Sequence, residues 1–119
     1  MNVEEIREYC LRKSGVTESF PFDDTTLVFK VMDKIFCMVN LDGDPGLFLK
    51  NTPEKVIDLR ERYPFVLPGY HMNKVHWNLV MMSQSGSDHL LKQWVDESYE
   101  LVVKGLPRKI RDELNSFKS

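Results

Sequence analysis

The architecture follows from the stretch Thr26-Leu27-Val28-Phe29-Lys30-Val31-Met32-Asp33-Lys34-Ile35-Phe36-Cys37-Met38-Val39. Its two halves are rich in β-branched and aromatic residues, and only the polar pair Asp33-Lys34 separates them. This spacing is typical of two antiparallel strands joined by a tight turn. The sequence therefore predicts a β-hairpin at residues 26–39.

Two further segments extend this hairpin into a sheet. The turn-forming run at residues 42–46 leads into the apolar segment 47–50, which suits a third antiparallel strand. Alternating side chains at residues 77–82 indicate another strand. The turns between the first three strands are too short for parallel crossovers, so we expect a largely antiparallel sheet with one or two strands added after residue 63.

Apolar residues at helical spacing predict four helices around these strands. Each has a start signal, such as Asn2 with Glu5, Thr52 before Pro53, Ser85 or Ser87, and Pro107. The predicted ranges are 3–13, 53–62, a long helix that ends at Gly105, and a short helix after Pro107. This order predicts an α+β fold whose antiparallel sheet is covered by helices on one side.

Composition narrows the class of protein. With 119 residues, 42% hydrophobic and 29% charged, the chain suits a single globular domain over residues 1–119. A net charge of -2 does not favour nucleic acid or an anionic membrane as a partner of the whole molecule. Because no apolar stretch reaches membrane-spanning length and the start lacks a signal-peptide pattern, we expect a cytoplasmic protein with no membrane contact.

Common catalytic and cofactor motifs are missing from the sequence. The positions of the six glycines fit neither a dinucleotide-binding motif nor a P-loop motif, so no cofactor is expected. His71 and His76 lack metal-ligand spacing, and Cys10 and Cys37 are interpreted as buried thiols. The acid pairs Asp23-Asp24 and Asp96-Glu97 are interpreted as solvated surface. We therefore expect no metal site and no enzymatic activity.

Two windows without Asp or Glu stand out in this acidic chain, at residues 62–87 and 101–111. The first contains Gly69-Tyr70-His71-Met72-Asn73-Lys74-Val75-His76-Trp77-Asn78, and the second is basic. Such side chains hold phosphates and base edges if the fold brings both windows to one face. The candidate binding residues are His71, Asn73, Lys74, His76, Asn78, Lys104, Arg108, Lys109 and Arg111.

A purely structural role for the same residues is the alternative. Tyr70 and Trp77 can anchor the core, and the Asn and His side chains can satisfy backbone groups of a loop. Lys104 can complement the carboxyl end of a helix. The sequence leaves both interpretations open.

Several motifs together resemble the MmcQ/YjbR family over residues 5–111. They are Phe20-Pro21-Phe22, residues 26–31, the block 68–78, residues 98–103 and Leu106-Pro107-Arg108-Lys109. The chain departs from the family pattern at Met32-Asp33-Lys34, where relatives tend to have a Gly-containing turn. The resemblance implies a CyaY-like α+β domain, similar in shape to double-wing DNA-binding proteins, and no accepted enzymatic activity.

Two functions remain as expectations. The first is a non-enzymatic DNA-binding module that uses the 69–78 block and the basic cluster at residues 104–111. The second is a small-ligand or protein-interaction domain that uses the same loop as a pocket or docking surface, with a small anionic ligand or a protein as partner.

Overall fold

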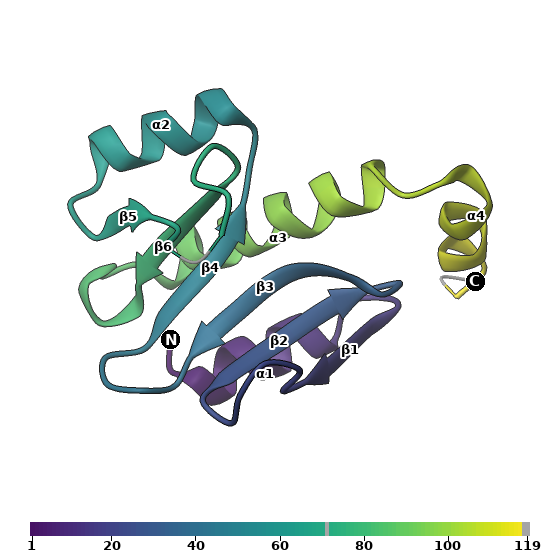
Figure 1. Cartoon of the computed structure of the whole chain (residues 1–119), viewed down its shortest axis with the longest axis horizontal. Coiled ribbons are helices and arrows are strands. Elements are labelled where there is room, and N and C mark those ends of the chain that lie inside the picture. The colour runs from purple at the N-terminus through teal and green to yellow at the C-terminus, as the bar shows by residue number, and fades with distance from the viewer. Residues whose placement is uncertain (71, 118–119) are drawn as a thin grey trace.

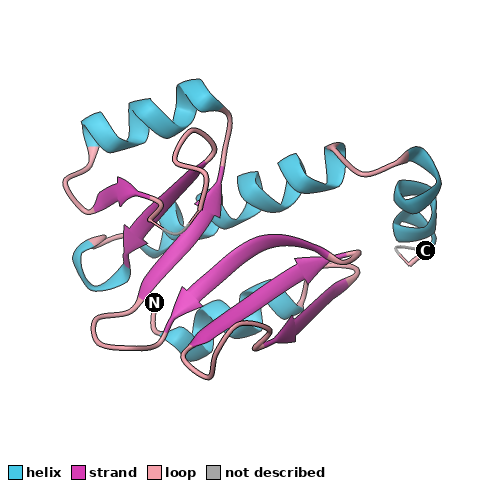
Figure 2. Ribbon diagram, in the orientation of Figure 1, coloured by secondary structure: helices cyan, strands magenta, loops and turns pink. Residues whose placement is uncertain are grey.

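Six strands form one antiparallel sheet in the computed structural model, which describes residues 1–70 and 72–117 (Figures 1 and 2). The strands lie in the order β1-β2-β3-β4-β6-β5. The elements are α1 (Val3–Leu11), β1 (Val16–Ser19), β2 (Thr26–Val31), β3 (Lys34–Asn40), β4 (Gly46–Lys50), α2 (Pro53–Arg62), β5 (Val66–Pro68), β6 (Trp77–Met81), the 3-10 turn η1 (Met82–Gln84), α3 (Asp88–Lys104) and α4 (Arg108–Ser116). The predicted α+β class is confirmed.

The helices α1 and α3 lie behind the sheet in the view of Figure 1, so the viewer looks onto a face that no helix covers. Alternate strand residues such as Leu27, Phe29 and Val39 point to the helices and form the main core with Leu91 and Val95 of α3. Their burial supplies most of the favourable free energy of folding. We call the opposite surface of the sheet the helix-free face.

The predicted hairpin is confirmed, but its turn lies one residue earlier than expected. Met32 and Asp33 occupy the two turn positions with φ of 48° and 69°, and Lys34 already belongs to β3. Two consecutive positive φ angles match the twist of antiparallel strands. The turn was not predicted at Met32 because methionine rarely adopts the left-handed conformation.

A β-bulge in β3 changes which side chains face the helices. Phe29 pairs with Cys37 and Lys30 pairs with Ile35, so Phe36 is the extra residue. Phe36 and Cys37 consequently both enter the helix-side core although they are neighbours in sequence.

The buried Ser98 of α3 joins two strands where their pairing stops. The β3 and β4 ladder ends at the pair Cys37 and Leu49, and the two strands separate beyond it (Figure 1). The Ser98 hydroxyl donates to the Phe36 carbonyl at 2.5 Å and accepts from the Lys50 N–H at 2.9 Å. One side chain thus satisfies two backbone groups that the ladder leaves unpaired.

The two edge strands of the sheet are short, and one of them departs from the sequence-based expectations. β1 was not predicted, and it pairs with β2 while Glu18 binds Arg7 of α1 through two N–H groups at 2.8 and 2.7 Å. β5 supplies the second of the one or two strands expected after residue 63. The first helix ends at Leu11 rather than at residue 13.

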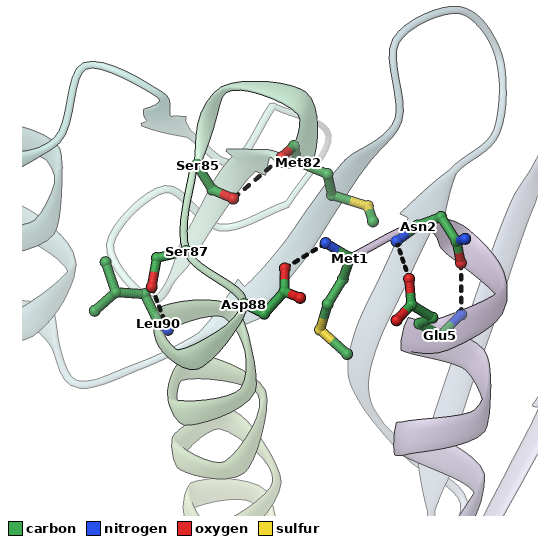
Figure 3. Close-up of polar contacts among 8 residues, drawn as sticks. All are labelled: Met1, Asn2, Glu5, Met82, Ser85, Ser87, Asp88 and Leu90. Carbon is green, nitrogen blue, oxygen red and sulfur yellow. Dashed lines mark hydrogen bonds and ion pairs between the residues drawn. The ribbon is translucent and has the colours of Figure 1, made fainter.

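Caps expected from the sequence hold the helix starts. Asn2 and Glu5 form the reciprocal capping box of α1, and Ser87 rather than Ser85 caps α3 through the Leu90 N–H (Figure 3). The Met1 amino group also pairs with Asp88 in the first turn of α3 (Figure 3). The starts of the two helices are therefore fixed side by side.

Polar contacts also connect the C-terminal end of α1 with the middle of α3. The Tyr9 hydroxyl donates to Asp96 at 2.8 Å, Lys13 pairs with the same carboxylate, and Glu97 accepts from Asn51 at 3.0 Å. The interpretation of Asp96 and Glu97 as merely solvated acids is thus wrong. Burial and the bond to Asp96 raise the pKa of Tyr9 to about 12.

We expect Tyr9 to make stability depend on alkaline pH. The phenol of an unfolded chain ionises near pH 10, whereas folded Tyr9 keeps its proton until about pH 12. Its contribution is therefore full below pH 10 and is lost as the pH rises through 12. In the variant Tyr9→Phe, the melting temperature should fall less steeply over this window. Tyr70→Phe is the control, and equal slopes for Tyr9→Phe and the parent protein would refute the assignment.

Candidate functional site

The 69–76 loop joins β5 to β6 and carries the block that the sequence singled out. Gly69 enters it close to the next strand, because its N–H donates to the Trp77 carbonyl at 3.1 Å. A Cβ atom at position 69 would lie 2.8 Å from that carbonyl oxygen, so the approach requires glycine. His71 lies outside the described residues.

Arg60 of α2 holds this loop against β6. Its Nε donates to the amide oxygen of Asn78 at 2.6 Å, and its Nη2 donates to the carbonyls of Trp77, at 3.1 Å, and Lys74. Asn78 is 2% exposed and donates its own amide to the Val56 carbonyl at 3.1 Å. The predicted ligand contact Asn78 is therefore engaged inside the fold by Arg60, a residue that the sequence analysis did not select.

Asn73 also serves the loop itself. Its side-chain oxygen accepts from the Val75 N–H at 2.8 Å, and its carbonyl accepts from the N–H groups of His76 and Trp77. His76 is half-buried, and its carbonyl accepts from Asn51. Side-chain hydrogen bonds of this kind define turns. The two asparagines follow the structural alternative that the sequence left open.

Lys74 is the exposed cation of the loop. Its ammonium lies 5.5 Å from the ring centre of Tyr70, which is 48% exposed. Such a contact between a cation and a ring is weak in water. Lys74 and Tyr70 therefore remain accessible to a partner.

The second basic window lies elsewhere. Lys104 ends α3, and Arg108, Lys109 and Arg111 belong to α4, which lies at one end of the long axis, well apart from the loop beside α2 (Figures 1 and 2). Within residues 1–70 and 72–117, none of the four has a carboxylate within ion-pair distance. The structure does not bring the two windows together, so they form no shared basic face. We call residues 104–111 the tail cluster.

A hollow opens instead on the helix-free face, with a volume of about 450 Å³. Val28, Met38, Phe48 and Trp77 make a second, smaller apolar cluster there. The apolar walls of the hollow are Phe22, Met38, Phe48 and Met72. Phe22 is 66% exposed, and Met72 comes from the 69–76 loop. The loop thus supplies one wall of a concave site whose other lining residues come from β2, β3, β4 and the loops at residues 20–25 and 41–45.

Polar groups border this hollow on one side. They are Asp23, Thr25, Thr26, Asn40 and Asp42. The N–H groups of Thr25 and Thr26 donate to Asp23 at 3.0 and 2.7 Å. The Thr25 bond lowers the pKa of Asp23 below its ordinary value, so its carboxylate is ionised at neutral pH.

Comparison with known proteins shows which family the chain belongs to. The sequence profile of the YjbR family matches residues 11–101. The chain belongs to the YjbR family. The resemblance to this family predicted from the sequence motifs is therefore confirmed.

Curated YjbR-family relatives match most of this chain. Uncharacterized protein YjbR of Escherichia coli strain K12 is 35% identical over 112 residues, which cover 93% of this chain and 95% of that protein. Uncharacterized protein YbdF of Escherichia coli O157:H7 is 36% identical over 107 residues, covering 89% and 88%. These names state no activity, ligand or partner.

Solved structures of similar proteins support the same YjbR-type fold. The crystal structure of Deinococcus radiodurans protein DR2400, a DUF419 domain, has a TM-score of 0.89 at 36% identity and covers 96% of this chain and 88% of that one. A Pseudomonas syringae protein has a TM-score of 0.74 at 26% identity, with coverage of 85% and 98%.

The two cysteines of this YjbR-family chain lie in its interior. Cys10 and Cys37 are both fully buried, as predicted. Their mutual hydrogen bond and burial raise the pKa of Cys37, which disfavours a reactive thiolate. The described residues hold no group of three metal-ligating side chains and no helix long and apolar enough to cross a membrane.

Proposed function

We propose that this domain is a non-enzymatic binding module that takes a small ligand in the hollow of its helix-free face. The observation that carries this proposal is the hollow itself, about 450 Å³ with four apolar walls. Small-molecule sites occupy about 300–1,000 Å³ and combine apolar walls with a few polar groups. The hollow matches that description, and the 69–76 loop acts as its rim rather than as a separate contact surface.

Exposed aromatic side chains on the loop that helps to line the hollow support the same function. Phe20 and Phe22 are 49% and 66% exposed on the loop between β1 and β2. Large apolar side chains gathered beside a concave surface mark binding sites more often than isolated ones do. Phe22 is thus placed to close over a bound molecule without supporting the core.

The variant Phe22→Ala tests the proposed site. A panel of nucleotides, amines and small acids is screened by thermal shift, where a ligand at 100 times its Kd stabilises by about 2.7 kcal/mol. We expect Phe22→Ala to weaken a hit by about tenfold, or about 1.4 kcal/mol. Ile57→Ala, which truncates another exposed apolar residue on α2, is the control. A flat response to the whole panel, or equal affinity for Phe22→Ala, would refute the proposal.

Nucleic-acid binding through the tail cluster is the second candidate. Lys104, Arg108 and Lys109 are exposed, Arg111 is half-buried, and the described residues offer them no ion-pair partner. Because these four cationic side chains are not engaged in such ion pairs, each of them can contact a phosphate. This candidate rests mainly on the tail cluster, because Asn78 is buried and the side-chain oxygen of Asn73 is bonded within the loop, which leaves Lys74 as the exposed cation of the loop.

Salt dependence tests this second candidate. Four phosphate contacts give a slope of about -3.6 for log K against log salt on duplex DNA. Replacing both Arg108 and Lys109 by Gln should remove about half of that slope, whereas Lys55→Gln on α2 should leave it unchanged. Fluorescence polarisation of labelled duplex and single strands at two salt levels measures it. No saturable binding at low salt would exclude the nucleic-acid role.

A further inference from the structure

The hollow lies at the acidic end of the sheet. Its neighbouring loops, residues 20–25 and 41–45, carry four aspartates and no Lys or Arg. The two loops lie side by side, because the Leu41 N–H donates to the Thr25 carbonyl at 2.7 Å and Thr26 pairs with Asn40. Negative charge from separate parts of the chain is therefore concentrated at one place.

The charged residues that line the hollow are acidic as well. Asp23 and Asp42 belong to its lining, and among residues 1–70 and 72–117 no Lys or Arg does. Asn40 directs its side-chain oxygen to the Asp42 N–H at 3.1 Å, which fixes the turn that carries the Asp42 carboxylate. Charge complementarity at such a site favours a positively charged group.

The apolar walls favour the same kind of group. Phe22 and Phe48 present aromatic rings, whose faces attract cations. Met38 and Met72 add polarizable thioethers that adapt to an apolar body. The wall composition suits a molecule with a cationic head and a hydrophobic remainder.

We propose that the hollow binds a small organic cation, an amine or guanidine carried on an aromatic or alkyl body. This inference rests on the proposed small-ligand function and specifies its ligand. The cationic head lies against Asp42 and Asp23, and the apolar body contacts Phe22, Phe48 and Met72. An anionic ligand, which the sequence suggested as a partner, would face two carboxylates, and the described part of the lining offers no Lys or Arg to offset them.

Three probes that share a benzyl group test whether the hollow prefers a positively charged head group. Phenethylamine, 2-phenylethanol and phenylacetate share the phenylethyl or benzyl group and differ in the head group. Titrations followed by amide NMR shifts of the full chain, at low salt, give their Kd values. We expect the amine to bind at least tenfold tighter than the alcohol and the acid to bind most weakly. Shifts should centre on residues 22–26, 40–42 and 48.

Substitution of one carboxylate completes the test. Asp42→Asn should bring the affinity for phenethylamine to within about threefold of that for 2-phenylethanol, and Asp112→Asn on α4 should change nothing. If the three probes bind equally, or the acid binds best, the cation inference is wrong and the small-ligand function stands. If none binds at the hollow while a nucleotide or an acid from the panel does, the cation inference alone is wrong. If nothing binds there, both fail.

Discussion

Replacing Ser98 by alanine is expected to lower the free energy of unfolding by about 2–4 kcal/mol, because two buried backbone groups lose their partner at once. The Phe36 carbonyl and the Lys50 N–H both bond to the Ser98 hydroxyl, and the side chain is 0% exposed. A buried, unsatisfied polar group costs about 1–3 kcal/mol. The methyl group of alanine fills most of the space, so the loss reports hydrogen bonding rather than a large cavity.

Urea denaturation of Ser98→Ala measures this loss. Ser83→Ala is the matched control, since Ser83 is exposed and its hydroxyl bonds only to Asp44 among the described residues. We expect this control to stay within about 0.5 kcal/mol of the parent protein. A Ser98→Ala loss as small as that of the control would show that the two strands do not depend on the hydroxyl.

Replacing Arg60 by methionine is expected to cost about 2–4 kcal/mol and to loosen the 69–76 loop. The guanidinium satisfies the buried amide oxygen of Asn78 and the carbonyls of Lys74 and Trp77. Methionine retains the apolar stem but donates no hydrogen bond. Among the described residues, the Asn78 side chain then keeps only its hydrogen bond to the Val56 carbonyl. Because Met72 of this loop lines the hollow, ligand binding there should weaken as well.

Arg62→Met separates this effect from a general loss of charge on α2. Arg62 is exposed and pairs with Asp58 one helical turn away, a contact worth about 0.3–0.5 kcal/mol. Urea denaturation gives the stability of both variants, and amide hydrogen exchange reports the loop. Protection of the Trp77 amide, bonded to Asn73, should fall only in Arg60→Met. Unchanged exchange in that variant would contradict the role of Arg60.

The elements that the sequence predicted best carry strong local signals. The helix at 53–62 has a capping threonine and a proline at its first turn, and the structure places it at Pro53–Arg62. The strand β1 was missed because Val16-Thr17-Glu18-Ser19 is short and mostly polar. Its pairing with β2 is a long-range contact that local propensity does not encode.

The candidate site was harder to predict for the same reason. Side-chain types singled out the 69–78 block, but residue type does not reveal whether an amide points to a ligand or to the loop backbone. The walls of the hollow come from positions as distant as Phe22, Phe48 and Met72, so they meet only through strand order and register. One signal was present: β2, β3 and β4 are apolar on both faces, while the predicted helices cover one.

The two outer strands limit how this molecule can associate. β5 has only three residues and ends in Pro68, which offers no N–H, and β1 has four residues with polar side chains at Thr17, Glu18 and Ser19. Short, polar or proline-bearing borders discourage the addition of a strand from another chain. Growth of the sheet into a continuous intermolecular ribbon is therefore disfavoured at both margins.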